Sequence, residues 1–113
     1  MAQLTRSSFN ELIGMNLKYM RKERDLTQEK VAKVLNVTFQ QIQKYENGKN
    51  ALCAFKIKKY CDFFNVSFKD ISDPYYIERK KALAEVKSLN DGDVKYKDFM
   101  NTYCEMIDGK NNS

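Results

Sequence analysis

The sequence lacks several residue types on which common protein chemistries depend. Its 113 residues include no histidine and only three cysteines. Without histidine, the usual general base and the commonest metal ligand are missing. Cys53, Cys61 and Cys104 share no CxxC spacing, so they build neither a disulfide framework nor a four-ligand zinc site within one chain. We therefore expect buried thiols at these positions, and a protein that is not an enzyme and needs no metal or cofactor.

Long apolar runs are also missing. Lys, Asp or Asn interrupts the apolar stretches every few residues, and the N-terminal region has no apolar core of the kind found in signal peptides. Alternation of β-branched residues never lasts long enough to predict a strand. The sequence therefore predicts an all-α, cytoplasmic protein without a membrane-spanning segment, with the length of one small domain and an appendage.

Charge is unevenly distributed along the chain. Residues 1–72 hold 13 Lys and Arg against 7 Asp and Glu, whereas residues 73–113 hold 7 against 8. The single proline, Pro74, stands where this balance changes, so we place a domain boundary at residues 72–74. A basic domain attracts phosphate polyanions, although a solvated basic surface produces the same balance.

Capping signals and helical spacing predict five helices before that boundary. The expected helices cover residues 8–24, 27–35, 38–46, 53–64 and 67–71. Four of them begin with a hydroxyl N-cap: Ser8, Thr27, Thr38 and Ser67. Glu11 completes a capping box with Ser8, and Asn36 occupies a tight turn for which its tolerance of the left-handed conformation suits it.

The segment from Gln28 to Tyr45 has the spacing of a helix-turn-helix. A helix, a three-residue turn and a second helix follow one another, with the small Ala32 where the two helices must cross closely. At 100° per residue, the polar face of the second helix lies opposite Ile42 and Tyr45. We expect this face to contact base edges in a DNA major groove through Phe39, Gln40, Gln43 and Lys44. Phe39 could instead pack on the protein itself.

Four basic residues lie near the end of the first expected helix: Lys18, Arg21, Lys22 and Arg24. They could form a phosphate-binding patch. They could equally solvate the outer face of that helix. The sequence leaves both interpretations open.

Two stretches resemble the Cro/C1-type (XRE) helix-turn-helix regulators. They are IGMNLKYMRKERDLTQEKVAKVLNVTFQQIQKYENGKN and the tail CDFFNVSFKDI, within residues 13–71. The resemblance implies a five-helix, lambda-repressor-like domain whose second helix abuts the DNA backbone and whose third helix enters the major groove. It also implies that Phe39, Gln40 and Lys44 face the bases. The implied phosphate contacts are Gln28, Thr38, Asn47, Lys49 and Asn50.

The same resemblance implies an inward ion pair between Arg21 and Glu46, which lie beside apolar inward positions. Asn36 stands where the family usually has glycine, and Leu52-Cys53 replaces the usual Pro-Ser before the fourth helix. We therefore expect that helix to be capped less well.

Residues 75–109 predict a helical hairpin. The first helix carries an apolar stripe that includes Tyr76 and Leu89, residues 90–93 form the turn, and a second stripe spans residues 96–107. A lone hairpin buries too little surface to be stable, so it packs on residues 1–72, on a second copy or on another protein. We favour dimerisation, because a two-fold dimer doubles the DNA contacts. The expected dimerisation residues are Leu83, Val86, Phe99, Met100, Tyr103 and Ile107.

These patterns predict a sequence-specific regulator that binds double-stranded DNA, acting as a homodimeric repressor on an operator. The alternative is an antitoxin or adaptor whose C-terminal helices bind a partner protein.

Overall fold

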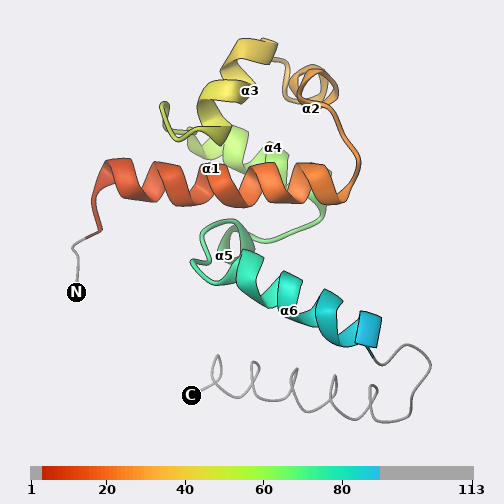
Figure 1. Ribbon diagram of the computed structural model, residues 1–113. Helices are drawn as coiled ribbons and strands as arrows, with labels where there is room; N and C mark the ends of the chain where they lie inside the picture. The colour runs from red at the N-terminus through yellow and green to blue at the C-terminus, as the bar shows by residue number, and fades with distance from the viewer. Residues whose placement is uncertain (1–3, 90–113) are drawn as a thin grey trace. The chain divides into compact units, whose positions relative to one another are not determined.

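The computed structural model describes residues 4–89 of the chain (Figure 1). This part contains six α-helices and no strand, which confirms the all-α prediction. The helices are α1 (Arg6–Glu23), α2 (Gln28–Leu35), α3 (Phe39–Glu46), α4 (Ala54–Phe64), α5 (Phe68–Ile71) and α6 (Tyr76–Leu89). Within the same residues, none of the helices has the length and apolar character needed to cross a membrane.

The first helix begins earlier than its sequence predicts. Thr5, not Ser8, is the N-cap of α1, and its hydroxyl accepts a hydrogen bond from the Ser8 amide at 3.0 Å. The Ser8 hydroxyl in turn accepts one from the Thr5 amide at 3.0 Å, so these two residues form the capping box. The expected box with Glu11 is therefore wrong, because Ser8 serves as the third helical residue of an earlier helix.

The other three predicted hydroxyl caps are confirmed. The side chains of Thr27, Thr38 and Ser67 accept hydrogen bonds from Lys30, Gln41 and Asp70 amides respectively. The helix α4 begins after Cys53, which makes no side-chain capping bond, as expected. Cys53 is nevertheless exposed and Cys61 only partly buried, so the expectation of buried thiols is wrong at Cys53. An N-cap lies at the surface end of a helix, which explains the exposure.

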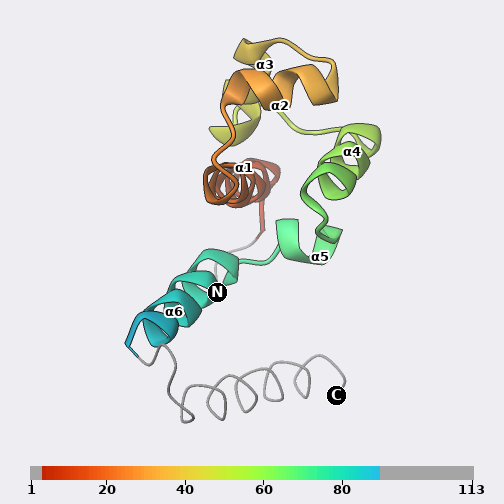
Figure 2. The same cartoon turned by 90° about the vertical axis from the view of Figure 1, so that its right-hand side faces the viewer.

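The structure divides into two compact units, the first ending at Ile77 and the second beginning at Glu78. In the first unit, α1 runs between α2 and α3 on one side and α5 on the other (Figures 1 and 2). The inward faces of α1 to α5 share one core. Its largest fully buried side chains include Tyr60, Phe64, Leu17, Met20, Leu35, Ile42 and Ile71.

The first unit extends a few residues beyond the boundary predicted at residues 72–74. Tyr76 is buried in its core, with its ring edge-on to Tyr19 at a centroid distance of 6.3 Å. Tyr76, the first residue of α6, therefore packs within the first unit. Asn16 binds the connection to α6, because its side-chain amide donates to the Ile71 and Asp73 carbonyls at 2.8 and 2.9 Å.

The second unit contains most of α6, on which Leu83 and Val86 are half-buried. The other part of the predicted hairpin lies outside the described residues. This includes the turn at residues 90–93, Cys104 and four of the expected dimerisation residues: Phe99, Met100, Tyr103 and Ile107.

Candidate nucleic-acid interface

The turn between α2 and α3 has the conformation that its sequence predicts. Asn36 adopts φ 56° and ψ 49°, in the left-handed region. The Val37 amide donates to the Ala32 carbonyl at 3.0 Å, and Thr38 then caps α3. Ala32, which the sequence places at the crossing of the two helices, is buried. These contacts fix the direction in which α3 leaves α2.

One face of α3 is buried and the opposite face is open. Ile42 is fully buried and Tyr45 is 6% exposed. Of the four residues predicted to contact bases, Phe39, Gln40 and Lys44 are exposed and Gln43 is half-buried. The predicted set therefore lies on the outward side of α3, with Gln43 at its margin.

The C-terminal end of α3 is bound to α1 by an ion pair. The Arg21 Nε donates to Glu46 Oε2 at 2.6 Å, and the Arg21 Nη2 donates to Oε1 at 3.0 Å. Arg21 also donates to the Leu26 carbonyl at 2.9 Å. Glu46 is 5% exposed, so this is a buried, bidentate pair. The expected pair is present, and it ties α1 to the end of α3.

Gln28 joins the same network. Its side-chain amide donates to Glu46 Oε1 at 3.0 Å, which links the start of α2 to the end of α3. The sequence predicts a phosphate contact for Gln28, and the structure adds this internal bond. The Glu46 carboxylate thus accepts three hydrogen bonds, two from Arg21 and one from Gln28, and these bonds restrict its rotation.

Sequence reasoning missed a glycine that brings α1 against α3. A Cβ atom on Gly14 would lie 2.6 Å from the Glu46 carbonyl oxygen and closer still to that of Tyr45. Only glycine permits this approach of the two backbones. Glycine inside a helix lowers stability by about 1 kcal/mol relative to alanine. A glycine within a predicted helix, such as Gly14, therefore indicates a packing role.

The residues predicted to bind phosphate flank α3. Thr38 precedes it, and Asn47, Lys49 and Asn50 follow it, with Asn47 and Lys49 exposed and Asn50 half-buried. The Lys49 amide donates to the Lys44 carbonyl at 2.9 Å, so the chain turns back at the end of the helix. Lys44 and Lys49 form no ion pair with any described residue.

The core of the first unit contains a buried tyrosine, Tyr60 of α4. Tyr60 is 1% exposed and burial raises the pKa of its phenol well above the usual value, with the Glu46 carboxylate adding to the effect. Its hydroxyl finds no hydrogen-bond partner within residues 4–89.

Within residues 4–89, no group of three or more Cys, Asp or Glu side chains is placed to hold a metal ion.

Comparison with known proteins places this geometry in a family. The helix-turn-helix family profile matches residues 17–71. Antitoxin PezA of Streptococcus pneumoniae is 38% identical over 60 residues, which cover 53% of this chain and 38% of that protein. An uncharacterized HTH-type transcriptional regulator of Sinorhizobium medicae is 37% identical over 54 residues, covering 48% and 39%. The match thus spans about two fifths of the length of these relatives.

Solved structures agree on the fold. Two crystal structures of the clp gene regulator ClgR from Corynebacterium glutamicum superpose with TM-scores of 0.55 and 0.53. The first covers 74% of this chain and 94% of that one at 17% identity, and the second covers 56% and 82% at 19% identity. The turn at Asn36, the capped α3 and the buried Arg21–Glu46 pair all lie within residues 17–71, the segment that matches the helix-turn-helix family.

Proposed function

We propose that this protein is a transcriptional regulator that binds a specific double-stranded DNA sequence through α3. The observation that carries the proposal is the two-sided character of α3. Its inner face is buried, and its end is fixed by the Arg21–Glu46 pair, while Phe39, Gln40 and Lys44 remain exposed. A rigidly placed helix with a polar outer face suits insertion into a major groove.

The exposed side chains have the chemistry for base recognition. Glutamine can bond adenine through both a donor and an acceptor, so Gln40 and Gln43 are candidates for A·T pairs. Lys44 can donate to the guanine acceptors, and Phe39 can contact a thymine methyl group. Gln28, Thr38, Asn47, Lys49 and Asn50 would bind phosphates on either side of α3. Those contacts set orientation and affinity without reading sequence.

The regulator would act as a homodimeric repressor. One α3 contacts a short half-site, and a two-fold dimer doubles the contacts and fixes the half-site spacing. The predicted dimerisation element is the region from residue 78 onward, including Leu83 and Val86. Occupying an operator would then block polymerase without any enzymatic activity or cofactor.

Selection of bound duplexes from a random DNA pool tests this function. The full chain should return one enriched motif, and a repeated half-site would report the dimer. On the selected duplex, Gln40→Ala should cost about 1 to 3 kcal/mol and lose preference at one base position only. Equal loss on every duplex would show that Gln40 contacts only phosphate. No enriched sequence at any salt concentration would overturn the proposal.

The likeness to antitoxin PezA favours a second candidate function. In that case the C-terminal region would bind a partner protein, and DNA binding would be secondary to that interaction. Stoichiometric co-purification of another protein with the full chain, but not with a chain ending at Ile77, would favour this function. A homodimer that binds DNA with no such partner would favour the first.

A further inference from the structure

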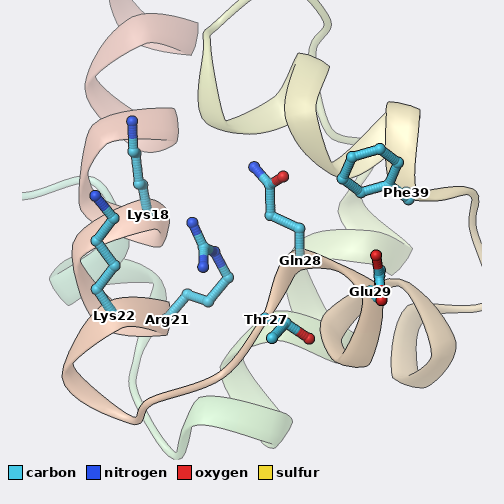
Figure 3. A pocket seen from close by; sticks show the side chains of 7 residues that line it. All are labelled: Lys18, Arg21, Lys22, Thr27, Gln28, Glu29 and Phe39. Atoms are coloured by element: carbon cyan, nitrogen blue, oxygen red, sulfur yellow. The ribbon is translucent and has the colours of Figure 1, made fainter.

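A cleft of about 480 Å³ opens beside the N-terminal end of α3. Its lining residues come from three helices and one loop: Lys18, Arg21 and Lys22, then Thr27, Gln28 and Glu29, and Phe39. Figure 3 shows the three basic side chains projecting from α1 on one side of Gln28, with Phe39 on the other side. The cleft therefore joins the C-terminal half of α1 to the exposed face of α3.

Two of the three positive charges in this cleft have no acidic partner among residues 4–89. The charge of Arg21 is compensated by Glu46, to which it donates two hydrogen bonds. Lys18 and Lys22 are exposed, lie one helical turn apart, and form no ion pair with any residue from 4 to 89. Glu29 is the only acidic lining residue, and Figure 3 places it on α2, beyond Gln28 from the two lysines.

The position of the cleft relates these lysines to the proposed DNA site. Phe39 is the first residue of α3 and also a wall of the cleft. The N-terminal residues of a helix in the major groove are the ones that contact base edges. The groove is only about 12 Å wide, so the sugar-phosphate backbone passes close to that end of the helix. Residues 47–50 follow the other end of α3 and do not line this cleft.

We propose that Lys18 and Lys22 bind a DNA backbone phosphate in this cleft, next to the bases that the start of α3 contacts. The inference rests on the proposed function, because the phosphate belongs to the same duplex. It assigns to α1 a direct part in DNA binding, in addition to its packing against α3. A phosphate contact adds affinity and orientation without base preference.

The salt dependence of DNA binding by Lys18→Gln/Lys22→Gln tests the proposal. Both lysines are exposed, so the full-length variant should fold like the parent chain. The two lysines share one phosphate, so the loss of that contact in the double variant should lower the slope of log affinity against log salt by about 1. Affinity at moderate salt should fall about tenfold, equally on the selected duplex and on single-base variants.

Two further variants separate a local contact from a change in net charge. Lys69→Gln removes one charge from α5, on the opposite side of α1 from α2 and α3 (Figure 1), and should leave the slope nearly unchanged. Glu29→Gln removes the carboxylate from the cleft and should strengthen binding several-fold. An ethylated phosphate that blocks the parent chain but no longer affects the double variant would locate the contact.

The outcomes distinguish this proposal from the function on which it rests. If the parent chain selects a DNA motif but Lys18→Gln/Lys22→Gln changes the slope no more than Lys69→Gln does, the two lysines only solvate α1 and this proposal is overturned. If the parent chain selects no motif, the proposed function fails, and the phosphate site fails with it.

Discussion

Two turns of the first unit have nearly the same sequence and the same backbone conformation. Residues 36–39 are Asn-Val-Thr-Phe between α2 and α3, and residues 65–68 are Asn-Val-Ser-Phe between α4 and α5. The asparagines adopt φ/ψ of 56°/49° and 55°/51°. In each turn the valine amide donates to the carbonyl five residues earlier at 3.0 Å, and the hydroxyl residue caps the next helix.

The helices that follow these turns differ in how their ends are bound to α1. The eight-residue α3 ends at Glu46, whose charge is paired with Arg21. The four-residue α5 ends at Ile71, whose carbonyl accepts a neutral hydrogen bond from Asn16. The comparison teaches that the turn sequence sets how a helix begins. Contacts with α1, distant in sequence, hold the end of each helix in place.

Breaking the contact at the end of α3 should have the largest effect. Arg21→Met leaves the buried Glu46 carboxylate without its cation and should lower the free energy of unfolding by about 3 to 5 kcal/mol. Denaturant unfolding of Arg21→Met, Glu46→Gln and the double variant measures the loss. The double variant should lose less than the sum of the two single losses. Additive losses below about 1 kcal/mol each would show that the pair contributes as little as an exposed one.

Breaking the corresponding contact at the end of α5 should cost less. Asn16→Ala removes two hydrogen bonds to carbonyl oxygens but leaves no buried charge, so we expect a loss of about 1 to 3 kcal/mol. At temperatures where the variant is folded, its DNA affinity should match that of the parent chain, because α5 is not part of the proposed interface. A loss as large as that of Arg21→Met would contradict the ranking of the two contacts.

Substituting the two asparagines tests whether the turns are locally equivalent. Asn36→Ala and Asn65→Ala each place an alanine in the left-handed region, which alanine tolerates less well than asparagine. Each substitution should lower the free energy of unfolding by about 1 kcal/mol. Asn36→Gly and Asn65→Gly are matched controls, because glycine adopts this conformation without steric cost. Thermal unfolding of the four variants measures the effect. Alanine losses that differ by more than twofold between the turns would mean that tertiary contacts also support the asparagine conformation.

Exchanging the two caps should have the smallest effect. Thr38→Ser and Ser67→Thr keep a hydroxyl oxygen that can accept the capping hydrogen bond, so stability should change by less than about 0.5 kcal/mol in either direction. The same unfolding measurements serve, with Thr38→Ala and Ser67→Ala as controls that remove the bond. An exchange as costly as its alanine control would show that the two turns are not interchangeable.

Local features of the first unit were predictable from the sequence. The turn at Asn36, the caps at Thr27, Thr38 and Ser67, and the burial of Ile42 and Tyr45 follow from residue types at helical spacing. These features depend on neighbours within about five residues. The sequence predicts too late a start for α1, because Ser8 can act either as an N-cap or as the third residue of a capping box. Glu11, three residues after Ser8, matches the pattern in which Ser8 is the N-cap.

Contacts between distant residues were harder to predict. Asn16 binds carbonyls 55 and 57 residues later, and Gln28 binds a carboxylate 18 residues later. No spacing rule predicts such pairs, because they depend on how the helices pack. The Arg21–Glu46 pair was expected only from a family resemblance. For the candidate DNA contacts, the sequence predicts which side chains share a face of α3, and binding experiments must test their roles.

The two polar contacts of α1 also have a consequence for how the domain opens. Asn16 and Arg21 lie on the same continuous helix, so unwinding α1 releases the ends of α5 and α3 together. Elements that share such contacts open as one cooperative unit. The amide hydrogens in the middle of these helices should therefore exchange with solvent through a common opening event. A DNA ligand that holds α3 in place would slow exchange in α5 as well, although α5 lies on the far side of α1.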